Sequence, residues 1–194
     1  MTAFADKLLF HPVTAAAWEA FLENDPPHDG VRLQLRKKNS AAPGILYGEA
    51  LDVALCFGWI DGQTGRLDDD YTLQAFTPRR ARSPWSQINR EHVARLEAAG
   101  RMRPAGLAEV ERAKADGRWD LAYRQKGAEI AADFRAALDA SPTAAAHYAT
   151  LTKQDLFAFT FRLSRVVRPE TRARKIAEFI AMLEAGRSFY GRAE

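Results

Sequence analysis

The alternation of apolar and polar residues marks the clearest strand of the chain, VRLQLRKK at residues 31–38. Val31, Leu33 and Leu35 fall on one face of an extended segment, and the residues between them are arginine or glutamine. A period of two is typical of a strand with one buried face and one face in water. The segment therefore predicts a sheet that covers a core on one side.

Two further strands are predicted from short runs of β-branched and aromatic residues, WID at 59–61 and YTLQAFTP at 71–78. The segment between them, GQTGRLDDD at 62–70, is rich in glycine and aspartate, which favour turns. Pro78 then ends the extended structure, because proline offers no backbone donor to a neighbouring strand. We therefore expect a small antiparallel sheet.

A period of three to four residues predicts helices on either side of these strands. In TAAAWEAFLEND at 14–25, Trp18 and Phe21 share a face, and Thr14 is placed to cap the helix. The segment GEALDVALCFG at 48–58 predicts a second, shorter helix that its last glycine closes. Both helices present apolar faces that can pack on the sheet.

From Ser86 onward the pattern is almost wholly helical. Ser141 precedes a proline at a predicted helix start, and Thr152 with Asp155 has the spacing of a capping box. We predict an α+β protein, in which a small antiparallel sheet with flanking helices occupies residues 1–126 and a helical domain occupies residues 127–194.

Cysteine content and hydropathy indicate where the protein resides. Cys56 is the single cysteine, so no internal disulfide can form, and its apolar neighbours suit a buried, inert thiol. The amino terminus lacks the basic start and apolar run of a secretory signal, and no stretch reaches the ~20 apolar residues that cross a bilayer. We expect a cytoplasmic protein without membrane insertion.

Positive charge gathers in two segments of this mildly basic chain, whose formal net charge is +3. Residues 79–118 hold ten Lys or Arg against five Asp or Glu, and residues 162–175 hold six against one. Local basic surfaces of this kind favour a small anionic ligand or a protein partner. The modest overall charge and the lack of a recognised motif do not favour nucleic acid.

Several common chemistries find no support in the motifs. The four histidines, at 11, 28, 92 and 147, stand in different predicted elements without zinc-ligand spacing, so we expect no metal. The glycine loops of nucleotide-binding proteins and the GxSxG motif are both absent, and no cofactor is predicted. Catalytic residues cannot be assigned from these patterns.

One short span, FGWIDGQTGRLDDDYTLQAFTPRRARSPWSQIN at 57–89, contains two of the four tryptophans, and three arginines gather near its end at 79, 80 and 82. We predict a ligand-binding site there, with aromatic walls and an arginine clamp for an anionic or planar ligand. The candidate residues are Trp59, Asp61, Arg79, Arg82, Ser83, Trp85 and Asn89.

A purely structural interpretation of the same span stays open. Both tryptophans can belong to the core, because an indole supplies a large apolar surface. The arginines at 79 and 82 can then pair with acids such as Asp61, Asp68 or Asp120. The functional interpretation is favoured for Arg82, Ser83 and Asn89, since polar residues before a helix can present donors to an anion.

Several motifs together resemble the YdeI/OmpD-associated family, whose members are also called bacteriocin-protection proteins. In the first half these are ALCFGWIDG, FTPRRARSPWSQIN, GRMRPAGL and AKADGRWDLAY. In the second half, SPTAAAHYATLTKQD and the ETRxR sequence at Glu170, Thr171, Arg172 and Arg174 resemble the family's helical domain. The resemblance implies an α+β domain, a helical domain of the OmpD-associated type and a link to envelope stress, but no reaction. The run Phe157–Phe161 is more aromatic than the family pattern leads us to expect.

Three classes of function follow in order of preference. The first is a non-enzymatic ligand-binding or interaction protein in stress resistance, because the polar cluster lacks an acid–base pair or a nucleophile. The second is an enzyme acting on a small anionic metabolite. The third is a nucleic-acid-binding protein.

The ETRxR sequence predicts a structural role for one arginine. Arg172 lies four positions before Ile176 and leans toward the apolar stripe of its helix, whereas Arg174 faces water. We expect Arg172 to dock the helical domain by bonding a carboxylate or carbonyl of the amino-terminal part.

Overall fold

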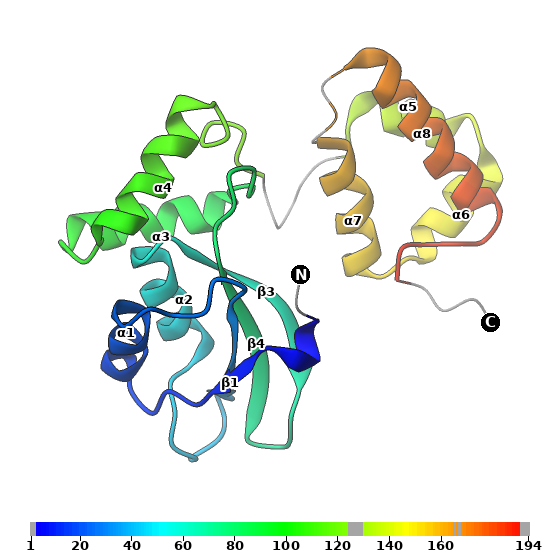
Figure 1. The fold of residues 1–194 in the computed structure, drawn as a ribbon. Helices are drawn as coiled ribbons and strands as arrows, with labels where there is room; N and C mark the ends of the chain where they lie inside the picture. The colour runs from blue at the N-terminus through cyan, green and yellow to red at the C-terminus, as the bar shows by residue number, and fades with distance from the viewer. Residues whose placement is uncertain (1–2, 124–129, 165, 167, 191–194) are drawn as a thin grey trace. The chain divides into compact units, whose positions relative to one another are not determined.

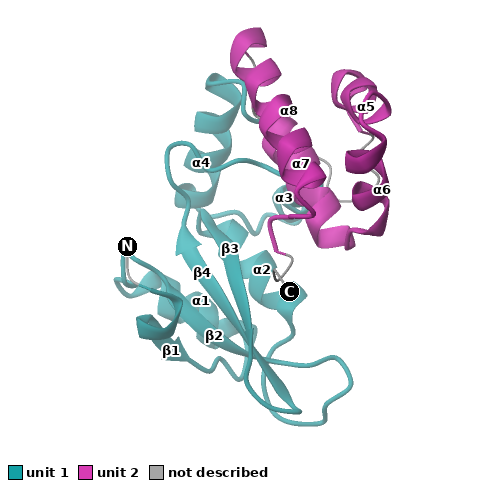
Figure 2. Ribbon diagram, turned by 90° about the vertical axis from the view of Figure 1, so that its right-hand side faces the viewer, with its two compact units in different colours: residues 1–122 teal, residues 123–194 magenta. Residues whose placement is uncertain are grey.

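The computed structural model describes residues 3–123, 130–164, 166 and 168–190. The chain divides into two compact units, residues 1–122 and residues 123–194 (Figure 2). The predicted boundary between residues 126 and 127 lies outside the described residues, as does the predicted start of a helix at Gly127.

The first unit contains the sheet and its helices (Figure 1). In chain order its elements are η1 (Phe4–Asp6), β1 (Leu8–Phe10), α1 (Ala15–Glu23), β2 (Val31–Arg36), α2 (Tyr47–Cys56), β3 (Trp59–Arg66), β4 (Tyr71–Pro78), α3 (Gln87–Ala98) and α4 (Pro104–Ala115). The second unit is built from helices joined by short connections in its described residues. It consists of α5 (Ala132–Asp139), α6 (Pro142–Thr150), α7 (Lys153–Ser164) and α8 (Pro169–Glu184). The predicted α+β class is confirmed.

The four strands are ordered β1-β2-β4-β3. Strand β4 pairs antiparallel with both β2 and β3, as expected for a small antiparallel sheet. The predicted alternation in β2 is confirmed, because Val31, Leu33 and Leu35 are at most 1% exposed. Strand β1 is an addition at the sheet edge, where its three residues pair parallel with β2. Three residues are too few to give a period, so the sequence held no signal for it.

The predicted turn at 62–70 is largely wrong, because β3 continues through it to Arg66. The register of β3 against β4 shifts between Asp61 and Thr64, as at a β-bulge. The side chain of Gln74 donates to the carbonyl of Gly62 (2.8 Å) at this irregularity and so satisfies the displaced backbone. The turn itself is short, and Asp68 Oδ1 caps it by accepting from the amide of Tyr71 (2.7 Å).

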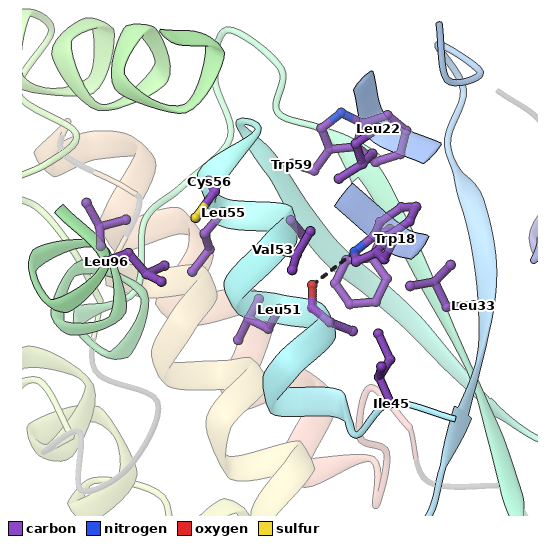
Figure 3. Packing of buried hydrophobic residues seen from close by; sticks show 14 of the residues in the cluster. Trp18, Leu22, Leu33, Ile45, Leu51, Val53, Leu55, Cys56, Trp59 and Leu96 are labelled. Carbon is purple, nitrogen blue, oxygen red and sulfur yellow. Dashed lines mark hydrogen bonds between the residues drawn. The ribbon is translucent and has the colours of Figure 1, made fainter. Parts of the chain in front are cut away.

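Helix α2 packs beside the sheet and between the other helices of the first unit. Trp18 of α1 is fully buried between these layers, and its indole N–H donates to the carbonyl of Ala50 (Figure 3). Cys56 ends α2 and is 2% exposed, so the predicted buried thiol is confirmed.

The second unit has its own core of aromatic and aliphatic side chains. The residues at its centre are Phe134, Leu138, Ala144, Tyr148, Phe159, Leu163, Phe179 and Leu183. The predicted cap at Ser141 is confirmed, and one of the two bonds of the predicted capping box at Thr152 is present. Ser141 Oγ accepts from the amide of Ala144 (3.4 Å), and Thr152 Oγ1 accepts from the amide of Asp155 (3.2 Å).

The expected partner of Arg172 is wrong, although its packed position is confirmed. Its Nε and Nη2 donate to the carboxylate of Asp133 (2.5 and 2.9 Å), and its Nη1 donates to the carbonyl of Leu163 (2.7 Å). Asp133 precedes Phe134 of the core, so Arg172 ties α8 to α5 and α7 within one unit. The positive charge of Arg172 is therefore paired with an acid of its own unit, Asp133.

Arg172→Ala is expected to lower the free energy of unfolding by about 1–2 kcal/mol, because it breaks a bidentate ion pair and strands a carbonyl. The matched control is Arg174→Ala, whose side chain is 74% exposed and should cost under about 1 kcal/mol. Urea denaturation of both variants measures the difference. Equal midpoints for the two variants would show that the ion pair contributes no stability.

Cys56 is expected to react with a thiol reagent only as fast as the protein opens locally. Burial removes the sulfur from reagent and also raises the pKa of the Cys56 thiol, so little thiolate forms. The labelling rate under native conditions, compared with the rate in denaturant, measures this protection. Rapid stoichiometric labelling of the native protein contradicts it.

Candidate functional site

The segment between β4 and α3 carries an arginine that lies over the ring of a tryptophan. The guanidinium carbon of Arg79 is 3.4 Å from the centroid of the Trp85 ring, and Arg79 Nη1 donates to the carbonyl of Pro84 (3.2 Å). Both side chains are buried, at 6% and 2% exposure. A cation desolvated over an indole is stabilised by the electrons of the ring face. The predicted pairing of arginine and tryptophan is therefore present, but inside the fold.

A second indole continues this arrangement to the surface. The rings of Trp85 and Trp119 meet edge to face at 4.9 Å, and Trp119 is half-buried. The guanidinium of Arg90 lies 5.1 Å from the Trp119 ring centroid, and Arg90 Nη1 donates to the Trp119 carbonyl (2.9 Å). We call these four residues, Arg79, Trp85, Trp119 and Arg90, the Arg–Trp stack. The stack runs from the buried side chains of Arg79 and Trp85 to the half-buried side chains of Trp119 and Arg90, which form its more exposed end.

The start of α3 is occupied by the protein itself. Ser86, which is 1% exposed, accepts from the amide of Asn89 through its hydroxyl (3.1 Å). Asn89 is 7% exposed. The Ser86 cap takes up the amide N–H of Asn89, which is one of the helix-terminal donors that an anion could have used. Burial also keeps the side chain of Asn89 away from solvent.

Arg82 and Ser83 lie on the loop that leads to Trp85. Ser83 Oγ accepts from the amide of Arg80 (2.9 Å), and its carbonyl accepts from Arg118 Nη1 (2.7 Å). Arg118 also pairs with Asp116 (2.8 Å), so the loop is fastened beside the segment that carries Trp119. Arg82 is exposed, and none of the ion pairs among the described residues joins it to an acid.

The remaining two candidates belong to the sheet. Trp59 is 5% exposed and meets Trp18 edge to face at 6.0 Å, as the structural interpretation expects for a core residue. Asp61 is half-buried and accepts a hydrogen bond from the hydroxyl of Tyr47 (2.9 Å). The seven candidates thus fall into three places. Three are buried within residues 79–89, two lie on the loop before α3, and two belong to β3: Arg79, Trp85 and Asn89; Arg82 and Ser83; Trp59 and Asp61.

A hollow of about 460 Å³ opens at the exposed end of the Arg–Trp stack. Its lining consists of Gln87, Arg90, Glu91, Ala94 and Trp119. Sequence reasoning missed Arg90 and Trp119, which are 29 residues apart in the chain. The segment GRWDLAY stood out in the sequence as part of a family motif, and nothing local indicated that its tryptophan meets Trp85.

A second polar cluster joins α2 to α3. Asp52 accepts from Arg95 Nη2 (2.6 and 2.8 Å) and contacts His92 Nδ1 (2.8 Å). An aspartate that orients an imidazole is also part of many catalytic sites. Among the described residues, however, no serine, threonine or cysteine hydrogen-bonds His92. The cluster is therefore an ion-pair network that holds the two helices together.

Asp52→Asn is expected to lower the free energy of unfolding at pH 7 by about 1–3 kcal/mol, since it removes a partly buried charge with three contacts. Burial raises the pKa of Asp52, but hydrogen bonds from Arg95 and His92 outweigh this effect and hold it below 3.8. With a depressed folded-state pKa, the stabilisation is complete above about pH 5 and is lost as the pH falls through the unfolded-state and then the folded-state pKa.

Chemical denaturation of the wild type and Asp52→Asn between pH 7 and pH 2.5 measures this dependence. The stability difference should shrink below pH 4. Asp69→Asn is the control, because the side chain of Asp69 is 97% exposed. A difference that stays constant down to pH 2.5 contradicts the assignment.

Two further observations limit the chemistry of the described residues. They contain no cluster of three or more His, Cys, Asp or Glu side chains that could hold a metal ion. Across the same residues, no helix combines the length and the apolar character needed to span a bilayer.

Comparison with known proteins assigns each half of the chain to a family model. Residues 10–109 match the model described as Domain of unknown function (DUF8412). Residues 127–186 match the model described as Bacteriocin-protection, YdeI or OmpD-Associated, in agreement with the resemblance of the ETRxR region. Searches of curated proteins and of solved structures find no match. The chain therefore belongs to the DUF8412 family and carries a carboxy-terminal domain of the YdeI/OmpD-associated, bacteriocin-protection type.

Proposed function

We propose that the protein is a non-enzymatic binding protein that holds a small planar anion against Trp119 and Arg90. The observation that carries this proposal is the hollow at the exposed end of the Arg–Trp stack, which offers an indole face and a guanidinium together. Its volume of about 460 Å³ lies within the range of small-molecule sites.

Arg90 is suited to receive the anion. One of its nitrogens donates to the Trp119 carbonyl, and none of the ion pairs among the described residues engages it with a carboxylate. A guanidinium has five N–H donors, so donors remain for a carboxylate or phosphate on the ligand. The bond to Trp119 fixes the group beforehand and lowers the entropy lost on binding.

Trp119 supplies the surface for a planar ring. Behind it, Trp85 and Arg79 are buried and keep the indole in one orientation. Gln87 and Glu91 add an amide and a carboxylate to the lining. A ligand with an acidic group could bind Arg90 through that group, and an amino or hydroxyl donor on the same ligand could bind Glu91.

Arg82 and Ser83 enter the proposal as residues of the loop that supports Trp85. Arg82 adds an exposed positive charge to that loop. Binding is favoured over catalysis because the lining, as far as the described residues go, has one acid and no histidine, cysteine, serine or threonine. The family description supports a role in protection against bacteriocins. We propose that the protein performs this protective role in the cytoplasm, where its single thiol stays reduced.

The test uses 4-aminobenzoate as probe, since it combines a planar ring, a carboxylate and an amino donor. Calorimetric titration should give saturable one-to-one binding, and aniline, which lacks the carboxylate, should bind at least about ten-fold more weakly. Arg90→Gln and Trp119→Ala should each weaken binding of 4-aminobenzoate by a similar factor.

Arg66→Gln is the matched control, because the side chain of Arg66 is 81% exposed and lies on β3. It should bind like the wild type. Arg82→Gln tests whether the loop charge contributes. The proposal is wrong if Arg90→Gln and Trp119→Ala bind the probe as the wild type does.

A further inference from the structure

The aromatic run FAFTFR at 157–162 has a physical explanation in helix α7. Phe159 points into the core of the second unit and is 0% exposed. Phe157 and Phe161 are four residues apart, so they share a face that lies on the other side of the helix from Phe159. Their rings stack at 5.4 Å and are only half-buried. The core therefore does not require these two side chains.

Other aromatic rings extend this face. Tyr123 meets Phe161 edge to face at 4.7 Å. The carboxylate of Asp155 accepts from the amide of Tyr190 (3.0 Å), which holds the segment after α8 against α7. Asp155 is itself 3% exposed and is bonded to Thr152 (2.7 Å), so the anchor is rigid. Tyr190 is thereby kept near Phe157 and Phe161 although its side chain is 56% exposed.

An open pocket of about 550 Å³ lies at this face of the second unit. It is lined by Phe157, Ala158, Phe161, Arg162, Lys175 and Tyr190. Three aromatic rings make most of the wall apolar, and the two charged residues of the lining are both cations. No carboxylate is among these lining residues.

The two cations differ in how they are held. Lys175 Nζ pairs with Glu178 (2.7 Å) on the same helix. The guanidinium carbon of Arg162 lies 4.1 Å from the Phe189 ring centroid, and no ion pair among the described residues links Arg162 to an acid. An aromatic wall alone would attract cations. Glu178 offsets the charge of Lys175, and the charge of Arg162 leaves the described edge of the pocket net positive, so the pocket repels cations and favours an anion.

We propose that this pocket is a second binding site, specific for an apolar organic anion: an aromatic or aliphatic body that packs against Phe157, Phe161 and Tyr190, with an acidic group held by Arg162 and Lys175. The apolar body gains from leaving water, and the acidic group from a charge-assisted contact. The site is independent of the hollow at Trp119, where a carboxylate lines the wall.

The probe is 1-anilinonaphthalene-8-sulfonate, which is aromatic, anionic and fluorescent once shielded from water. The full chain should bind one equivalent. Arg162→Gln combined with Lys175→Gln should weaken binding by at least about ten-fold, since each change removes a charge-assisted contact. Arg162→Lys keeps the charge and should bind within about three-fold of the wild type.

Arg174→Gln is the matched control, because it removes a positive charge from α8 at a side chain that is 74% exposed and does not line the pocket. It should leave binding unchanged, as should Trp119→Ala, which disrupts the other site. Amide resonances of residues 157–162 should shift most on titration. Unchanged affinity in the double variant, or equally tight binding of the uncharged N-phenyl-1-naphthylamine, overturns the proposal.

Discussion

The indole of Trp18 is the contact on which the first unit depends. It is fully buried, and its N–H must find an acceptor inside the protein, which it does at the carbonyl of Ala50 (3.2 Å). Its ring also packs against Phe10, Phe76 and Trp59, at 6.0 to 6.2 Å between centroids. One side chain of α1 therefore ties α2 to three strands of the sheet. A smaller residue would leave both a cavity and an unused acceptor.

The position of α2 in turn decides where the candidate site can form. Helix α4 approaches the end of α2 so closely that a β-carbon at Gly106 would overlap the carbonyl oxygen of Cys56. The amide of Arg103 donates to that same oxygen (3.1 Å) and fastens the start of α4. At the end of α4 the amide of Trp119 donates to the carbonyl of Ala113 (3.0 Å). The half-buried indole of Trp119 is thus positioned by a series of backbone contacts that begins at the core.

The helices of the second unit are held together by a different set of residues. Its core is a cluster of aromatic rings around Phe134, Phe159 and Phe179, and its helices are fastened by the bonds of Arg172 and Asp155. The two family matches fall within the two units, one in each. Each unit also has its own pocket with its own chemistry. Among the described lining residues, one pocket combines an indole with both signs of charge, and the other combines three aromatic rings with two cationic side chains.

Local patterns in the sequence determined the parts of this fold that neighbouring residues control. The alternation of β2 and the caps at Thr14, Ser86 and Ser141 depend on contacts within four residues, so the amino-acid order specifies them. The sequence also allowed the stacking of an arginine on Trp85 to be predicted, because Arg79 and Trp85 are only six residues apart. Burial of Cys56 followed from the apolar segment around it.

Tertiary structure alone decided the rest, because these features depend on contacts between residues far apart in the chain. The pairing of β1 with β2 spans 23 positions, and the bond between Arg172 and Asp133 spans 39. Which tryptophan reaches the surface was likewise undetermined: Trp85 is buried because Trp119 covers it. Any one of these residues has several partners of suitable chemistry, and only the packing of helices and strands selects among them.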